Sequence, residues 1–63
     1  MNDTNYKIRA WMGANRVSGR KLAEMMEMSY NTLKPKLAGK VKWTVSDAEA
    51  LIKATGLPFE ELF

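Results

Sequence analysis

Apolar residues recur along the chain at intervals of three and four positions, which is the spacing of one face of an α-helix. This spacing predicts five short helices and no strand, over about residues 4–14, 19–26, 30–37, 45–55 and 58–63. The residues predicted to face inward are Ile8, Trp11, Met12, Leu22, Ala23, Met26, Leu33, Leu37, Ala48, Leu51 and Ile52, and Phe59, Leu62 and Phe63 are predicted to give the last helix its apolar contacts. The predicted fold class is all-α, as one compact five-helix domain over residues 1–63.

Residues suited to cap helices stand before these ranges, and glycines stand after two of them. The expected N-caps are Asp3, Thr4 or Asn5 for the first helix, Ser18 and Ser29 for the next two, and Thr44 with Asp47 as a capping box; the expected glycine stops are Gly39 and Gly56. The connector that follows the third helix carries Trp43, whose side chain we expect to pack into the core.

The composition excludes several classes of protein. The chain has 63 residues with no cysteine and no histidine, which excludes disulfides and the usual zinc sites. The longest apolar runs are a few residues, so we expect no membrane span. No glycine-rich phosphate loop or suggestive carboxylate pair is present, so we expect no enzyme, no cofactor, no metal and no small-molecule substrate.

Charge is distributed unevenly. The net charge is +3, and the acidic residues leave residues 4–23 and 28–46 with cations only. Two cation-only stretches in a small fold suggest one side that faces a polyanion. The stretch from Met28 to Lys42 combines a cap, short polar side chains and four lysines, and we interpret it as a DNA-reading helix followed by a basic exit loop.

Asn31 is the strongest candidate for reading a base, because its amide can bond N6 and N7 of adenine together. The base-contacting set is Tyr30, Asn31, Thr32 and Lys34; the phosphate-contacting set is Ser18, Arg20, Lys21, Lys36, Lys40 and Lys42. Each position also has a plainer interpretation. Tyr30 would pack beside Trp43, and Asn31, Thr32 and the lysines would form a solvated face.

In this order and spacing, the residues resemble the Cro and CI-type helix-turn-helix family (the XRE class), close to small phage repressor-like proteins. The matching residues are Ile8-Arg9, Val17-Ser18, Leu22-Ala23, Met28-Ser29, Thr32-Leu33, Lys36-Leu37-Ala38-Gly39-Lys40 and Trp43-Thr44-Val45-Ser46-Asp47. The resemblance implies a lambda-repressor-like domain with a helix-turn-helix at about residues 18–37. It also implies binding of double-stranded operator DNA, with a homodimer formed through the C-terminal helices.

Three residues depart from the family pattern. Glu27 stands where a glycine is common, and a left-handed backbone there would cost roughly 1–2 kcal/mol. Lys36 replaces an apolar residue, so Leu37 is expected to make the core contact. Pro35 cannot donate to the carbonyl of Asn31 and costs about 3 kcal/mol inside a helix. The recognition helix is therefore expected to end near Lys34 or to be kinked there.

The resulting hypothesis is a sequence-specific DNA-binding transcriptional regulator of the bacterial cytoplasm, in the host of a phage or prophage. It would occupy an operator with its recognition helix, about residues 30–37, in the major groove. The alternative is a protein-interaction module on the same fold, a phage anti-repressor or accessory subunit with little DNA binding. Its support is Pro35, because a damaged recognition helix would no longer read DNA.

Overall fold

Five helices account for most of the chain between residues 3 and 63, the part that the computed structural model describes. They are α1 (Asp3–Asn15), α2 (Gly19–Met25), α3 (Tyr30–Leu37), α4 (Val45–Thr55) and α5 (Phe59–Leu62), and no strand occurs in that part. The all-α prediction is therefore confirmed. The side chain of Asp3 lies outside the described residues, and so does the capping role expected of it.

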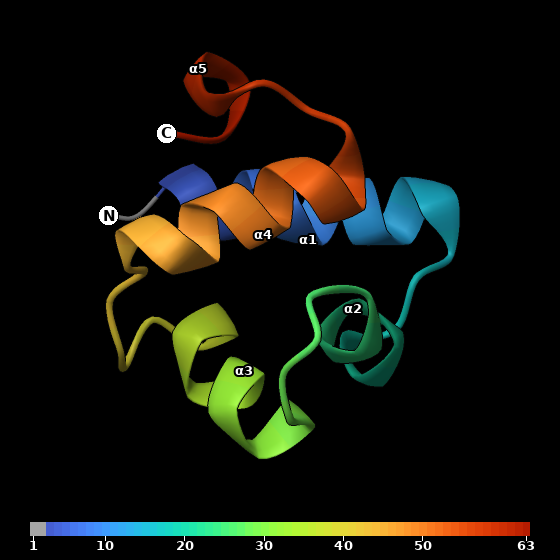
Figure 1. Cartoon of the computed structure of the whole chain (residues 1–63). Helices are drawn as coiled ribbons and strands as arrows, with labels where there is room; N and C mark the ends of the chain where they lie inside the picture. Colours follow the sequence, from blue (N-terminus) through green and yellow to red (C-terminus); the bar gives the residue numbers. More distant parts are fainter. Residues whose placement is uncertain (1–2) are drawn as a thin grey trace.

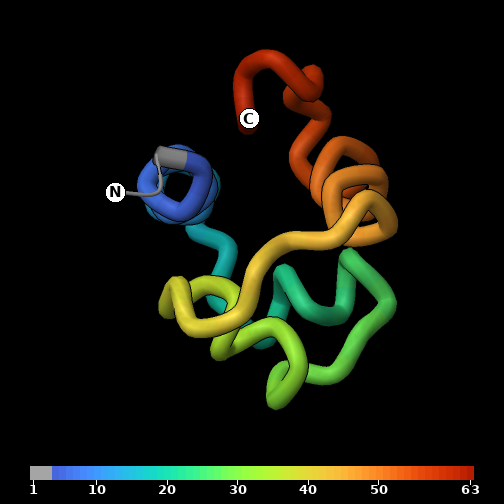
Figure 2. The backbone as a smooth tube through the Cα atoms, turned by 90° about the vertical axis from the view of Figure 1, so that its left-hand side faces the viewer, coloured from blue at the N-terminus to red at the C-terminus, as the bar shows by residue number. Residues whose placement is uncertain are grey.

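The helices are arranged in tiers. α1 and α4 run alongside each other and both appear nearly end-on in Figure 2, with α2 and α3 below them and α5 above (Figures 1 and 2). α2 packs on α3, and α5 packs on α1. The Cα radius of gyration is 10.3 Å, against roughly 10.6 Å expected for a globular chain of this length, so the described chain is compact.

Each helix contributes one completely buried aliphatic side chain to a shared core. These are Ile8, Leu22, Leu33, Leu51 and Leu62, all with no exposed surface. Burial of each stabilises the fold by about 1.5–3 kcal/mol relative to an exposed side chain. Because the five come from five helices, the core holds even the short α5 in place. Trp43 is half-buried and packs against this core, in line with its predicted position.

Local signals set most helix ends as predicted. The hydroxyl oxygens of Ser18 and Ser29 accept the N–H groups of residues 21 and 32, at 3.1 Å and 3.2 Å. Thr44 and Asp47 form the complete capping box. The glycines that follow α3 and α4 have left-handed backbones, with φ of 83° and 76°. Asn5, one of three alternative caps of α1, instead lies within that helix, and its side chain is buried in the protein.

Two non-glycine residues also have left-handed backbones, Arg16 with φ 55° and Glu27 with φ 57°. Each is followed by a half-buried apolar residue and then by the serine cap of the next helix. The same hydrogen bond closes both turns: Val17 N–H to Met12 O at 2.8 Å, and Met28 N–H to Ala23 O at 3.0 Å. The connectors before α2 and α3 therefore share one local structure, at a backbone cost of roughly 1–2 kcal/mol each.

α3 continues through Pro35 to Leu37, so the expectation that it ends near Lys34 is wrong, and the kink expected there as the other outcome stays a prediction. Donors from α1 stabilise its last turn: Asn5 Nδ2 lies 3.1 Å from Lys36 O and 3.3 Å from Leu37 O, and Arg9 donates to Leu37 O at 2.8 Å. The carbonyl of Pro35 accepts two N–H groups of the following turn, at 2.9 Å and 3.3 Å. Together these bonds offset the loss of the hydrogen bond that Pro35 cannot donate, and those from Asn5 and Arg9 require the folded chain.

Candidate nucleic-acid interface

Exposed polar side chains occupy the outer face of the first half of α3. Asn31, Thr32 and Lys34 are exposed, while Leu33 between them is buried. The Thr32 hydroxyl lies 2.9 Å from the Ser29 hydroxyl, so it takes part in capping the helix. Neither Asn31 nor Lys34 has a side-chain hydrogen bond or ion pair within the described chain, and their polar ends are open to a partner.

Tyr30 is half-buried where the first turns of α2 and α3 meet. The guanidinium of Arg20 lies over its ring, 4.6 Å from the centroid. Gly19 lies against the ring from α2: a Cβ at that position would approach Tyr30 Cε1 to 2.9 Å. The ring of Tyr30 therefore meets Gly19 of α2 at one edge and Arg20 of α2 over one face, while the indole N–H of Trp43 bonds to Asn5.

Most of the predicted phosphate-contacting residues lie on the surface. Ser18, Arg20, Lys21, Lys40 and Lys42 are all exposed. The Lys21 ammonium lies 3.6 Å from Glu24, but both side chains are more than half exposed, so this pair holds the ammonium only weakly. The Ser18 hydroxyl accepts a backbone N–H at the start of α2 and keeps its own hydrogen to donate.

Lys36 does not belong to this surface. Only 11% of its side chain is exposed, and its ammonium forms an ion pair and hydrogen bond with the buried carboxylate of Asp47 in α4. The prediction that Lys36 contacts phosphate is wrong for this structure. Leu37 is buried, as expected, but Lys36 also faces inward. Its aliphatic stem packs inside while its charge meets a carboxylate, as buried charges generally do.

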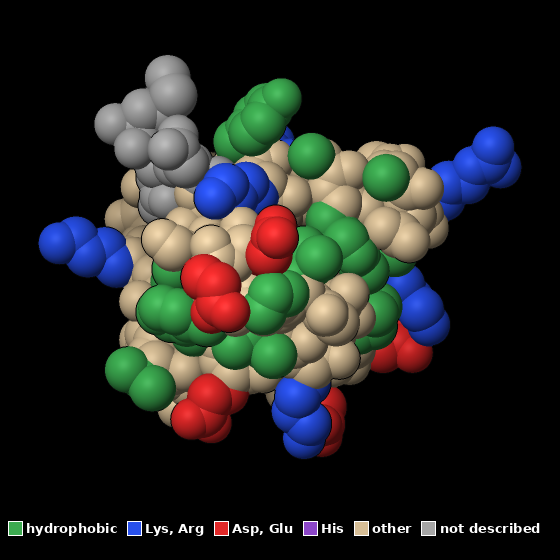
Figure 3. All heavy atoms as spheres, turned by 90° about the horizontal axis from the view of Figure 1, so that it is seen from above, with side chains coloured by type: hydrophobic (Ala, Val, Ile, Leu, Met, Phe, Trp, Pro, Cys, Tyr) green, Lys and Arg blue, Asp and Glu red, His purple; other side chains and the backbone are tan. Residues whose placement is uncertain are grey.

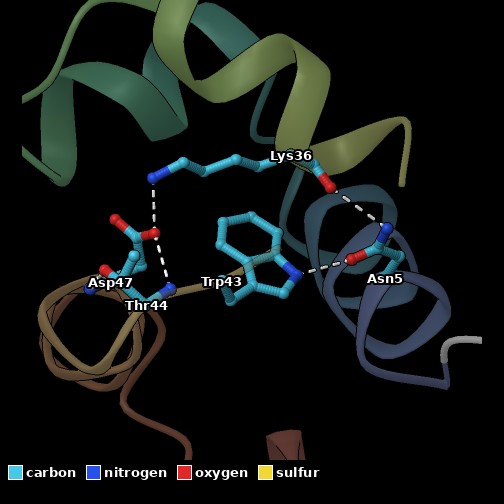
Figure 4. Close-up of polar contacts among 5 residues, drawn as sticks. All are labelled: Asn5, Lys36, Trp43, Thr44 and Asp47. Atoms are coloured by element: carbon cyan, nitrogen blue, oxygen red, sulfur yellow. Dashed lines mark hydrogen bonds and ion pairs between the residues drawn. The ribbon is translucent and has the colours of Figure 1, made fainter. Parts of the chain in front are cut away.

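A polar network around Trp43 connects α1, α3 and α4 (Figure 4). The amide of Asn5 accepts from the indole Nε1–H at 2.7 Å and donates to the carbonyl of Lys36 at 3.1 Å. At the other side of the indole, the Lys36 side chain reaches Asp47. Lys36 is thus held at both its backbone and its ammonium, which fixes the end of α3 relative to the rest of the fold.

Opposing effects set the pKa of Asp47. Burial alone would raise it, but hydrogen bonds from Lys36 and Thr44 and the charge of Lys36 together hold the pKa below its ordinary value of 3.8. The Thr44 N–H donates to the same carboxylate at 2.9 Å as part of the capping box. The carboxylate is therefore ionised in the folded protein at neutral pH, and it neutralises Lys36.

A groove of about 320 Å³ opens between α1, the start of α2 and α3. It is lined by Arg9, Met12, Gly19, Tyr30, Lys34, Leu37 and Ala38. Arg9 and Gly19 line this groove but were not among the site residues predicted from the sequence. Gly19 carried a usable signal, since glycine in the first turn of a helix often marks close approach of another chain segment. Arg9 carried none, because its role depends on a partner 28 residues away.

The first turns of the helices differ in charge. α4 and α5 have acidic residues there, Asp47 in one and Glu60 and Glu61 in the other, whereas α2 and α3 have none. Carboxylates normally stabilise a helix N-terminus by interacting with its positive end. The N-termini of α2 and α3, where candidate residues lie, therefore keep their positive electrostatic potential. In α2 the cationic side chains of Arg20 and Lys21 increase this potential.

No group of three histidine, cysteine or acidic side chains that could hold a metal occurs among the described residues. Within residues 3–63, no helix combines the length and hydropathy needed to cross a membrane.

No protein-family model, curated protein or solved structure matches this chain. The likeness to the Cro and CI-type family therefore remains a prediction from the residues.

Proposed function

We propose that the chain is a sequence-specific DNA-binding regulator, in which residues 18–37 form a helix-turn-helix and α3 enters the major groove. The observation that carries this proposal is the charge at the starts of α2 and α3. Both first turns lack acidic residues, and exposed Arg20, Lys21 and Lys34 lie on the same two helices as Asn31 with its open amide. Lysine and arginine supply the attraction to phosphate, and an asparagine amide supplies discrimination between bases.

The packing of α2 on α3 also supports the proposal. Ala23, in the middle of α2, is 2% exposed, and the resemblance implies a small side chain at this position because α3 packs against it. The connector of residues 26–29 is short and ends in the serine cap of α3. A regulator of this kind would act in the bacterial cytoplasm by occupying an operator and blocking polymerase. It would do so without a cofactor or a catalytic step.

DNA titrations test the proposal. With duplex DNA from upstream of its own gene, we expect affinity to fall as salt rises, with a log–log slope of about −0.9 per neutralised phosphate. Lys42→Met should make this slope shallower by about 0.9. Lys53→Met, at the end of α4, and Lys36→Met, which loses a buried charge, should leave the slope unchanged where the variant remains folded.

Base reading is tested separately. Asn31→Ala should reduce the preference for the upstream sequence over random duplex by about 5- to 150-fold. If Asn31→Ala and Lys34→Ala bind every sequence as the wild type does, the assignment of base reading to α3 is wrong. If the wild type binds no duplex even at low salt, the proposed function fails as a whole.

A protein-interaction module is the alternative, but its support has weakened. That hypothesis depended on a recognition helix damaged at Pro35, and α3 instead continues to Leu37.

Self-association through the C-terminal helices belongs to the proposed function. The rings of Phe59 and Phe63 are 5.0 Å apart and stacked, and the two residues are 55% and 43% exposed. A second copy of the chain would cover them.

A further inference from the structure

Arg20 and Tyr30 form a stacked pair that joins the starts of α2 and α3. The guanidinium carbon of Arg20 lies 4.6 Å from the centre of the Tyr30 ring, within the range of a cation–π contact. Arg20 is the second residue of α2, and Tyr30 is the first residue of α3. The pair therefore stands beside Asn31, at the edge of the surface proposed to read bases.

Gly19 permits this arrangement. A Cβ at position 19 would lie 2.9 Å from Tyr30 Cε1, closer than real Cβ contacts come, so any other residue would displace the ring. The ring is thus seated against Gly19 and overlaid by Arg20. Because Gly19 meets one edge of the ring and Arg20 covers one of its faces, the ring of Tyr30 serves as a support for the guanidinium rather than as a free group for stacking on DNA.

Arg20 has no carboxylate partner in the described chain. The ion pair of this region joins its neighbour Lys21 to Glu24, and the first turn of α2 contains no acidic residue. A cation in the first turn of a helix is also disfavoured by the positive end of the helix. The folded chain therefore gains little from this charge, and the stacking contact leaves the edge donors of the guanidinium unused.

We propose that Arg20 reads a guanine in the major groove, with Tyr30 as its positioning residue; this inference rests on the proposed DNA-binding function. Stacking covers one face of the guanidinium and leaves its in-plane N–H groups for a bidentate contact. Guanine presents the matching pair of acceptors, O6 and N7, on its major-groove edge. Arg20 and Tyr30 thus exchange the roles expected from the sequence, where Tyr30 touched a base and Arg20 touched phosphate.

Selection from a random pool of duplexes tests the assignment. The wild type should enrich a site with a guanine at one defined position. Arg20→Lys, which keeps the charge but loses the planar fork, should lose the preference at that position and keep the others. Lys21→Met is the matched control: it removes a cation from the adjacent position and should weaken binding to all sequences evenly.

Replacing that guanine by 7-deazaguanine removes the N7 acceptor. Wild-type affinity should then fall by about 5- to 150-fold, and the affinity of Arg20→Met should change little. Tyr30→Phe keeps the ring and should behave as the wild type. Tyr30→Leu removes the aromatic face and should reduce discrimination at this guanine while salt-dependent binding persists. Circular dichroism of each variant would establish that it is folded.

An unchanged guanine preference in Arg20→Lys would overturn the inference. So would salt-dependent binding by the wild type without enrichment of any sequence, although DNA binding itself would then stand. Failure of the wild type to bind duplex at all would remove the proposed function and this inference together.

Discussion

At the scale of single residues, Lys36 differs most from its prediction, because it was expected on the surface and is mostly buried. Its carbonyl accepts from Asn5 of α1 and its ammonium binds Asp47 of α4, so one residue joins three helices. Loss of one partner from a buried ion pair typically costs about 3–5 kcal/mol, because the other charge is left without compensation. Lys36 therefore contributes to stability through the same charge that suggested DNA contact.

The stability of the protein should depend on pH through Asp47. The folded-state pKa lies below the ordinary value of 3.8, so unfolding at acidic pH takes up a proton. The contribution of Asp47 is fully present above its unfolded-state pKa and is lost as pH falls through the folded-state value. We expect the free energy of unfolding to fall below about pH 4. Asp47→Asn should be less stable at neutral pH and should lose less on acidification.

Urea titrations followed by circular dichroism, repeated from neutral to strongly acidic pH, measure this effect. Glu49→Gln is the matched control, since Glu49 is an exposed carboxylate on the same helix. It should follow the wild-type curve closely. An Asp47→Asn curve parallel to the wild type over the whole pH range would contradict the role of the buried pair.

At the scale of helices, replacement by alanine is predicted to affect stability differently at two glycines. Nothing lies within 4 Å of a Cβ built on Gly13 in α1, whereas a Cβ on Gly19 would meet Tyr30. Gly13→Ala should therefore raise the free energy of unfolding by about 0.5–1 kcal/mol, through the better helix propensity of alanine. Gly19→Ala should give no such gain, because the ring of Tyr30 must move. Thermal melts of the two variants compare them directly, and an equal gain in both would contradict the close contact at Gly19.

The helix ends show how far local sequence information reaches. Ser18, Ser29 and the Thr44–Asp47 box were predicted correctly because a cap and its partner lie within three residues of each other. Gly39 was also predicted correctly as the stop of α3. The continuation of α3 through Pro35 was not expected, because the donors that stabilise its end come from α1, about thirty residues earlier. The same limit applies to the candidate site. Exposure of Asn31 followed from helix periodicity, whereas the burial of Lys36 depended on which residue of α4 faces it.

At the scale of the whole molecule, the charges are separated. Residues 4–44 contain nine lysines and arginines and two glutamates, while residues 45–63 contain one lysine and four acidic residues. Seen from the α5 side, acidic and hydrophobic side chains are interspersed near the centre of the surface, and most basic side chains lie toward its edge (Figure 3). The acidic and apolar side would therefore remain available while the α2–α3 side contacts DNA.

Salt should act in opposite directions on the two proposed associations. DNA binding should weaken as salt rises, because counterions released from the DNA gain less entropy when the surrounding solution is already concentrated in salt. Self-association through Phe59 and Phe63 brings Glu60 and Glu61 of two copies together, so screening should strengthen it. Sedimentation velocity at low and high salt measures this. Phe63→Ser should reduce the dimer, and Val41→Ser, at an exposed apolar residue in the connector after α3, should not. A monomer under all conditions would contradict the proposal.

The amide of Asn5 has a consequence for the kinetics of the fold. Its hydrogen bonds join residues separated by 31, 32 and 38 positions, whereas the caps and turns of α2 and α3 are made within a few residues. Local contacts form before long loops close, because closure is opposed by chain entropy. The bonds of Asn5 therefore belong to a late step of folding, and interactions made late mainly slow unfolding. The first helix, which supplies no residue to the proposed reading surface, would in this way set the lifetime of that surface.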